Sequence, residues 1–435
     1  MVGGGIIMYS KLEKKFKVNY PTNNNATYTS LLNYSKNLDT PFQRWYRYKE
    51  GYSIELVELL INEYNKNPKG IILDPFLGSG TTILGAKKCN LKSIGYEVNP
   101  FSSFLAKAKT EEYSHEDLKE FLKVYKFVIT DSKLLNQDYE LPLLSFSNKV
   151  FDLDIEKYIM NVKVRIEKYN ENLKVKNLLL IGWLSSIEKF SNYRKSGNGL
   201  KIRKTKNKIV ITIEEVCNYL NDEYEKMYND ISTSKNGKTS IVYNKSSLQM
   251  KEDINDKSIS GIIFSPPYAN CFDYTEIYKL ELWFGEFVKS YEDMKKLRKK
   301  SLRSHLNSSL SNDDDSILKS DLLKELIINL SQKEIWDKKI PIMLKNYFSD
   351  MFKIIKDSYD ILEKDGFCSI IVGNSAYGGI VFPTDLILAD FAESIGFKVD
   401  KIDVYRYIIP SSQQYNETLK NKKYLRESVV CLIKM

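Results

Sequence analysis

The stretch GIILDPFLGSGTTILGAKKC, residues 70–89, constrains the fold of this chain more than any other. Apolar β-forming residues lead into a glycine-rich turn, and the turn leads into a segment whose apolar residues have helical spacing. Residues 91–100 then have the pattern of a second strand, which ends at Glu97, and a helical pattern follows it. Because strands that alternate with helices form parallel βαβ units, we predict an α/β protein whose mostly parallel sheet carries helices on both faces.

The alternation of strands and helices is interrupted once. Between residues 111 and 235 three helical patterns follow one another without strands, so we expect a helical insertion there. Strand patterns return at residues 239–244 and 261–265, and strands and helices alternate again towards the C-terminus. We therefore divide the chain into a loose N-terminal lead-in (1–36), an α/β domain (37–110 and 236–435), the helical insertion (111–235), and a second insertion, basic and polar, inside that domain (286–335).

Composition limits the classes of protein to consider. The net charge of +9, from 65 basic and 56 acidic residues, favours a polyanionic partner. Five cysteines without paired spacing indicate a reducing compartment, and no apolar run is long enough for a signal peptide or a membrane span. We therefore expect a cytoplasmic protein without membrane contact. The chain has only two histidines, His115 and His305, so we expect no bound metal.

DPFLGSGTT, residues 74–82, has the position of a nucleotide-binding loop, after a strand and before a helix. It lacks the lysine of a P-loop and the third glycine of the dinucleotide fingerprint, although Gly78 and Gly80 permit a tight turn close to a ligand. Glu97 follows Gly80 by 17 residues, near the ~20-residue offset at which an acid binds ribose hydroxyls. With Asp74 placed to face a cationic amine, these residues favour an adenosine-containing ligand over a plain tight turn.

GIIFSPPYAN, residues 261–270, ends a predicted core strand abruptly. Pro266 and Pro267 cannot extend a strand ladder, so Ser265 and Tyr268 lie on a rigid turn. Taken alone, two prolines also suit a simple strand terminator. Together with the glycine-rich loop, the turn resembles the catalytic motif of the amino-methyltransferases, which use S-adenosylmethionine to methylate exocyclic amines of DNA bases.

The resemblance to this family covers residues 38–110 and 239–435, and it implies a class I, Rossmann-like methyltransferase fold for the α/β domain. It also implies that S-adenosyl-L-methionine is the cofactor and is bound by Asp74, Phe76, Gly78, Ser79, Gly80, Thr81 and Glu97. The catalytic residues that it implies are Ser265, Pro266, Pro267 and Tyr268. Asn244 replaces the acid that is usual in a third motif of the family, which leaves the contact to the adenine of the cofactor open.

The turn has the groups that methylation of a base amine requires. The lone pair of such an amine is delocalised into the ring, so a catalyst must accept hydrogen bonds from its N–H groups as charge develops on nitrogen. We expect Ser265 Oγ and the Pro266 carbonyl to accept these bonds, and Tyr268 to stack on a base that is flipped out of the duplex.

Three targets of methylation remain to be compared. Cytosine N4 is preferred, because a serine before the two prolines is commoner in the cytosine enzymes of the family, and adenine N6 and an amine of an RNA base stay open as alternatives. Cytosine C5 is disfavoured, because none of the cysteines follows a proline. A nucleotide-binding module without catalysis is disfavoured as well, because both motifs are intact.

Two basic runs flank the predicted catalytic turn, at residues 191–208 and 295–305. The first is interrupted by glycine and asparagine and contains no acid, so we expect a basic loop there. The residues expected to contact double-stranded DNA are Arg194, Lys195, Lys201, Arg203, Lys204, Arg298 and Arg303. The helical insertion is the expected target-recognition region. No nuclease motif is recognisable, so any cognate restriction endonuclease would be a separate chain.

Overall fold

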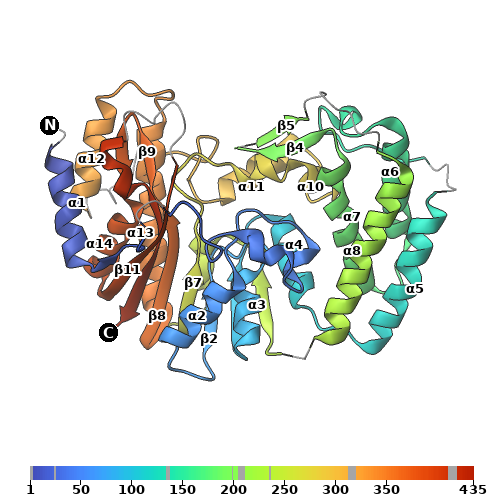
Figure 1. Cartoon of the computed structure of the whole chain (residues 1–435), viewed down its shortest axis with the longest axis horizontal. Coiled ribbons are helices and arrows are strands. Elements are labelled where there is room, and N and C mark those ends of the chain that lie inside the picture. The colour runs from blue at the N-terminus through green and yellow to red at the C-terminus, as the bar shows by residue number, and fades with distance from the viewer. Residues whose placement is uncertain are drawn as a thin grey trace.

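The structure, a computed structural model, describes residues 3–23, 26–133, 138–197, 199–203, 211–234, 237–311, 320–409 and 419–435. The described residues form one large sheet with helices on both faces, and a group of helices lies beside it (Figure 1). From edge to edge its strands are β1 (Val18–Asn19), β11 (Phe397–Tyr407), β12 (Arg426–Lys434), β8 (Leu362–Gly373), β7 (Ile259–Phe264), β2 (Ile71–Asp74), β3 (Lys92–Tyr96) and β6 (Ser240–Tyr243). Strand β12 is antiparallel to β11 and β8, and the other neighbours are parallel. The predicted α/β fold with a mostly parallel sheet is confirmed.

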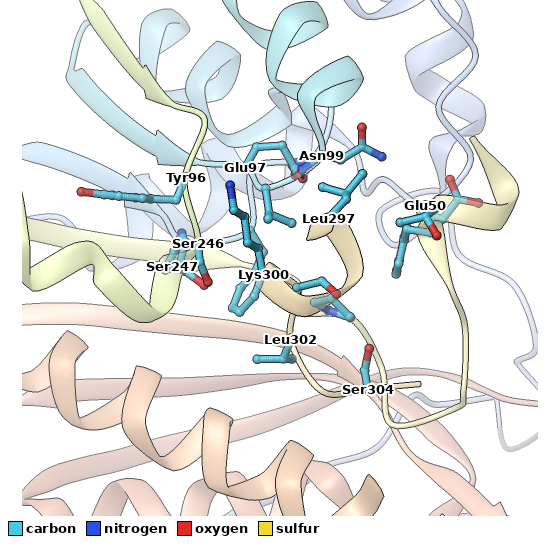
Figure 2. Close-up of a pocket in the computed structure, with 18 of the residues that line it drawn as sticks. Glu50, Tyr96, Glu97, Asn99, Ser246, Ser247, Leu297, Lys300, Leu302 and Ser304 are labelled. Carbon is cyan, nitrogen blue, oxygen red and sulfur yellow. Dashed lines mark hydrogen bonds between the residues drawn. The ribbon is translucent and has the colours of Figure 1, made fainter. Parts of the chain in front are cut away.

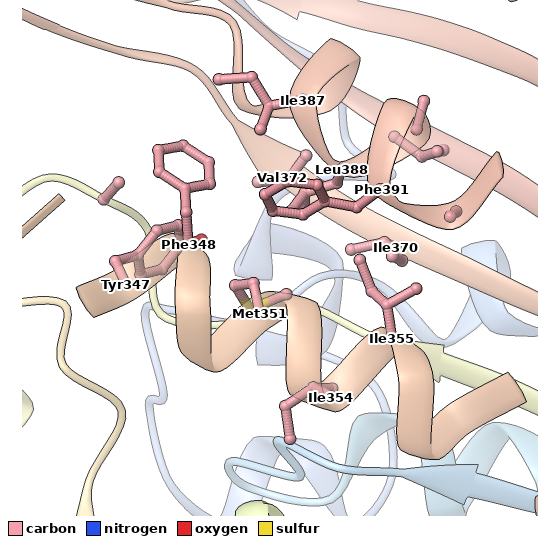
Figure 3. Packing of buried hydrophobic residues seen from close by; sticks show 14 of the residues in the cluster. Tyr347, Phe348, Met351, Ile354, Ile355, Ile370, Val372, Ile387, Leu388 and Phe391 are labelled. Carbon is pink, nitrogen blue, oxygen red and sulfur yellow. The ribbon is translucent and has the colours of Figure 1, made fainter. Parts of the chain in front are cut away.

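Different helices cover the two faces of the sheet, because successive side chains of a strand point to opposite faces. On β7, Ile263 packs with α2 and α3, whereas Phe264 packs with α13 and α14. The bounds of these helices are α2 (Ile54–Tyr64), α3 (Thr81–Lys88), α13 (Ile340–Ile361) and α14 (Thr384–Ile395). Figure 3 shows the second layer, in which Ile355 and Phe391 lie beside Ile370 of β8.

Residues 3–23 are not part of a loose lead-in, which is what we expected of residues 1–36. Helix α1 (Gly3–Lys15) and strand β1 belong to the α/β domain, and β1 pairs in parallel with β11 at the edge of the sheet. Tyr9 is buried in the core, and Glu13 forms an ion pair with the buried Arg426 of β12 at 2.5 Å. A few side chains such as these anchor the segment to the domain. Its overall composition, rich in Asn and Ser, does not reveal such single anchoring residues.

Four helices lie where we expected the helical insertion: α5 (His115–Asp131), α6 (Leu153–Lys168), α7 (Leu173–Phe190) and α8 (Ile213–Thr233). Figure 1 shows them together at the end of the molecule opposite α1. They build a second hydrophobic core, in which Trp183 and Tyr224 are fully buried. Gly182 permits this packing, because a Cβ there would lie 2.2 Å from the Tyr224 ring.

The basic stretch that begins at residue 191 is a hairpin and not the loop that we expected. Strands β4 (Tyr193–Ser196) and β5 (Gly199–Ile202) pair in antiparallel fashion. Gly197, with a φ of +58°, occupies the turn between them, a conformation that glycine adopts without strain. Lys204 belongs to residues 204–210, which lie outside the described residues.

The remaining helices and strands connect these parts. They are α4 (Pro100–Thr110), α9 (Tyr274–Ile277), α10 (Lys279–Phe284), α11 (Tyr291–Lys300), α12 (Asp321–Ser331), β9 (Ser375–Tyr377) and β10 (Ile380–Phe382). The short 3₁₀ helices are η1 (Tyr34–Leu38), η2 (Gln43–Trp45), η3 (Ser147–Lys149), η5 (Ser247–Glu252) and η7 (Leu419–Tyr424). In the described part of the chain, no helix is long and apolar enough to cross a membrane.

Candidate functional site

The glycine-rich loop joins the carboxyl end of β2 to the first turn of α3. Gly78 and Gly80 have φ angles of +53° and +97°, which residues with a Cβ rarely adopt. Gly78 also needs the space, because a Cβ there would lie 3.3 Å from the Tyr48 ring. Gly78 therefore allows the backbone itself to form the surface next to Tyr48, and Gly80 allows the loop to pack closely on Ala106.

Glu97, just after β3, is hydrogen-bonded to the same loop. Its carboxylate accepts bonds from the amides of Gly78 and Asn99, both at 2.7 Å. Burial raises the pKa of Glu97 to about 7. Asn244, which stands where the resemblance leads one to expect an acid, donates to the Glu97 carbonyl at 2.7 Å. Asn244 therefore holds the backbone that positions Glu97.

Several of the predicted cofactor residues support the loop from behind. Asp74 is buried and accepts a bond from the Phe76 amide at 2.8 Å, and burial raises the pKa of Asp74 to about 7. Ser79 Oγ donates to Gln43 Oε1 at 3.5 Å, and Gln43 Nε2 donates to Thr81 Oγ1 at 2.9 Å. The predicted cofactor residues that line the cavity beside the loop are Phe76, Gly78 and Glu97, and those that do not line it are Asp74, Ser79, Gly80 and Thr81.

This cavity, which we call the loop cavity, has a volume of about 840 Å³ and opens to solvent. Figure 2 shows Glu97 and Asn99 along one side of it and Leu302 and Ser304 along the other. The wall thus combines carboxylate, amide, hydroxyl and apolar groups, as a polar nucleoside requires.

Part of the wall comes from the second basic run, and the sequence analysis missed this. We expected residues 295–305 to meet DNA, but Leu297, Lys300 and Ser304 line the loop cavity (Figure 2). Leu297 and Leu302 are buried apolar residues inside a run of lysines and arginines. That pair of leucines was the available signal that one side of this run faces the protein.

The SPPY turn follows β7, the neighbour of β2 in the sheet. Ser265 lines the loop cavity and also a second one, which we call the turn cavity. Pro267 lines the loop cavity and Tyr268 lines the turn cavity, and Pro266 is buried. The ring of Tyr268 packs on Gly373, where a Cβ would lie 2.7 Å from Cε2. The predicted catalytic turn therefore forms the partition between two cavities.

Polar and aromatic side chains line the turn cavity. They include Lys49, Tyr52, Asn270, Phe272, Arg406 and Glu427. Arg406 Nε donates to Glu427 Oε2 at 2.5 Å. Glu50 and Tyr274 line both cavities, as Ser265 does, and the Tyr278 hydroxyl donates to the Glu50 carboxylate. The two cavities thus meet at one hydroxyl, one carboxylate and one phenol.

The basic residues predicted to contact DNA fall into different environments. Those exposed on the β4–β5 hairpin are Arg194, Lys201 and Arg203. Arg298 and Arg303 are half-buried in ion pairs, with Asp273 at 3.0 Å and with Asp350 at 2.6 Å. Their guanidinium groups stabilise the segment around the loop cavity, and a contact of either with phosphate stays a prediction.

For Lys195 the structure corrects the prediction of a DNA contact. Its side chain is 3% exposed, and its ammonium donates to Glu281 Oε1 at 2.8 Å and to the Tyr46 hydroxyl at 2.6 Å. The ammonium also lies over the ring of Tyr278, 4.3 Å from its centroid. Lys195 alternates with the exposed Arg194 along β4, so its side chain points into the protein. Lys195 therefore attaches strand β4 of the hairpin to helix α10, which carries Glu281.

Comparison with known proteins adds independent evidence. A family model described as DNA methylase matches residues 6–108. The chain is 30% identical over 430 residues to the type II methyltransferase M.AvaI of Nostoc sp., and the alignment covers 92% of this chain and 88% of that protein. It is 27% identical over 440 residues to the type II methyltransferase M.BsoBI of Geobacillus stearothermophilus, with 90% and 85% covered. It is 22% identical over 400 residues to the type II methyltransferase M.MvaI of Kocuria varians, with 86% and 84% covered.

Proposed function

The chain belongs to the family of type II DNA amino-methyltransferases, and on this premise we propose that it methylates the N4 amine of a specific cytosine in double-stranded DNA. The observation that carries the proposal is the position of Ser265 between the loop cavity and the turn cavity. A group-transfer enzyme needs two ligand sites that share one reacting centre. Ser265, which lines both cavities, would lie at this reacting centre, with the cofactor in one cavity and the base in the other.

The loop cavity fits S-adenosyl-L-methionine, the methyl donor that the family implies. Glu97 is a carboxylate that can accept bonds from ribose hydroxyls, Phe76 and Tyr48 supply apolar surface, and Lys300 supplies a cation for a carboxylate. When bound, this cofactor supplies an electrophilic methyl group on a sulfonium.

The turn cavity fits an extrahelical base. Tyr268 provides an aromatic face on which a base can stack, a contact worth about 1–3 kcal/mol. Ser265 Oγ and the Pro266 carbonyl are the acceptors for the two hydrogens of the amine, and accepting them keeps the nitrogen lone pair available as positive charge develops. The rigid prolines hold these acceptors in place, which lowers the cost of ordering them in the transition state.

Duplex DNA would approach over the exposed face of the β4–β5 hairpin. Arg194, Lys201 and Arg203 are exposed there, and cations of this kind position a protein on the phosphate backbone without reading the sequence. The helical insertion that carries the hairpin is the proposed target-recognition region. A cognate restriction endonuclease, encoded as a separate chain, is the proposed partner in a restriction-modification system.

The test is to express the chain in a host without DNA methylation and to digest its DNA to nucleosides. Mass spectrometry should find N4-methylcytosine, and single-molecule sequencing should place it at one recurring sequence. A host that expresses Ser265→Ala at the same level is the matched control and should have little of the modified base. DNA without any methylated base would contradict the proposal.

A further inference from the structure

The turn cavity contains an arginine to which the proposed function assigns no role. Arg406 of β11 and Glu427 of β12 line this cavity together with Ser265 and Tyr268. The side chain of Arg406 is 23% exposed, and its Nε donates to Glu427, whose side chain is 10% exposed. A guanidinium has five N–H donors in a planar fork, so this bond leaves donors for a ligand.

The environment of Arg406 suits a neutral ligand better than a phosphate. Glu427 cancels its charge at a distance of 2.5 Å, so the pair as a whole presents hydrogen-bond donors and little net charge. Both groups also lie next to the stacking ring. Burial raises the pKa of Tyr268, Glu427 raises it further and Arg406 lowers it, because both charges are close to the phenol. The donors of Arg406 therefore belong to the site that would hold the base.

The two candidate bases differ at the edge that such a donor would meet. Cytosine carries its amine and the O2 carbonyl on either side of N3, whereas adenine has a C–H group where cytosine has O2. A cavity with an acceptor for the amine at Ser265 and a donor at Arg406 therefore matches cytosine. With adenine, a desolvated donor would be left without a partner, and sites of this kind reject such analogues strongly.

We propose that Arg406 selects cytosine by donating a hydrogen bond to O2 of the flipped base, with Glu427 holding the guanidinium in position. The inference rests on the proposed function, because it assumes that the turn cavity receives the target base. It adds a specificity-determining residue and a reason for cytosine that is independent of the SPPY motif.

The experiment uses duplexes of the sequence that the methylome identifies, with cytosine or adenine at the target position. The proteins are the wild-type chain, Arg406→Met and the double variant Arg406→Met/Glu427→Gln, in which no carboxylate is left unpaired. We expect Arg406→Met to lower kcat/KM for the cytosine duplex on the order of 10- to 100-fold, the effect of losing one buried hydrogen bond to a charged donor. The rate with the adenine duplex should not fall, so the preference for cytosine should shrink by the same factor.

Two controls separate this effect from damage to the fold. Lys401→Met removes another ion-paired cation of β11, outside both cavities, and should leave the preference unchanged. The affinity for S-adenosylmethionine, which would bind in the loop cavity, should be the same in all variants.

An undiminished preference for cytosine in the double variant would overturn the role of Arg406. N6-methyladenine as the wild-type product would overturn this inference and the proposed cytosine target together, and the absence of any methylated base would overturn the proposed methyltransferase activity itself.

Discussion

The ring of Tyr268 lies directly on Gly373, the last residue of β8. A Cβ at Gly373 would come within 2.7 Å of Tyr268 Cε2 and within 3.2 Å of Glu427 Cγ. Distances below about 3.0 Å force a neighbour to move, and here the neighbour is the half-buried aromatic ring of Tyr268. The glycine therefore sets the position of the ring on which the target base is proposed to stack.

Gly373→Ala should displace Tyr268 and weaken retention of the flipped base. Stacking is worth about 1–3 kcal/mol, so we expect a loss of DNA affinity at the target site in that range. A fluorescent base analogue at the target position would report the loss as reduced flipping. Gly237→Ala is a suitable control, because the three atoms nearest to its Cβ would all belong to the flexible side chain of Lys87. Normal flipping in Gly373→Ala would show that the ring has room to adjust.

Ser265→Ala should lower kcat and leave cofactor affinity nearly unchanged. The hydroxyl is needed most when charge develops on the amine, so its loss resembles removal of an oxyanion-type contact, at a cost of about 2–4 kcal/mol in the transition state. Single-turnover methylation, with cofactor binding followed by calorimetry, separates the two effects. A variant with full kcat, or one whose defect lies in cofactor binding, would contradict the assigned role.

Cofactor affinity should fall as the pH drops below about 7. The pKa of Glu97 is raised to about 7, so its carboxylate is charged above that pH and increasingly protonated below it. The charged form accepts hydrogen bonds from ribose hydroxyls, and so the dissociation constant should rise by up to about tenfold per pH unit below 7. Calorimetric titrations at pH 6, 7 and 8 would measure this.

Glu97→Gln is the matching variant for this pH dependence. It should bind the cofactor more weakly at pH 8, by about 1.5–3 kcal/mol for the loss of charged hydrogen bonds, and its affinity should vary little with pH. The pKa of Asp74 is raised to about 7 as well, but Asp74 lies behind the loop. If Glu97→Gln keeps the full pH dependence and Asp74→Asn loses it, the ribose contact is assigned to the wrong acid.

Substitutions of Lys195 and Arg194, which are adjacent on β4, should have different effects on stability and on DNA binding. Lys195→Met leaves the fully buried carboxylate of Glu281 without its cationic partner, and we expect a loss of about 3–5 kcal/mol in the free energy of unfolding. Arg194→Glu should change stability by less than about 0.5 kcal/mol but reduce the salt dependence of DNA binding. Urea unfolding and binding at several salt concentrations test the pair. Equal stability of the two variants would refute the buried role of Lys195.

Several features of this protein could be predicted from short stretches of sequence. The strand–loop–helix at residues 70–89 and the strand that ends before the SPPY turn lie where the sequence predicted them. Their signals are local, because glycine and proline restrict φ at single positions and amphipathic spacing repeats within one or two turns. The resemblance to the amino-methyltransferases rested on the same short stretches, and the comparisons confirmed it.

Only the tertiary structure decides which way individual side chains point and which residues they contact. Lys195 and Arg194 are adjacent basic residues in one run, yet only the pairing of β4 with β5 and the distant Glu281 turn one of them inward. The sequence reading assigned no role to Arg406, and it reaches the turn cavity because β11 lies beside β12 and its Glu427. The sequence by itself therefore determined the fold class and the two motifs, through local backbone constraints. The partition of the site into two cavities depended on contacts between residues far apart in the chain, and folding alone brings these together.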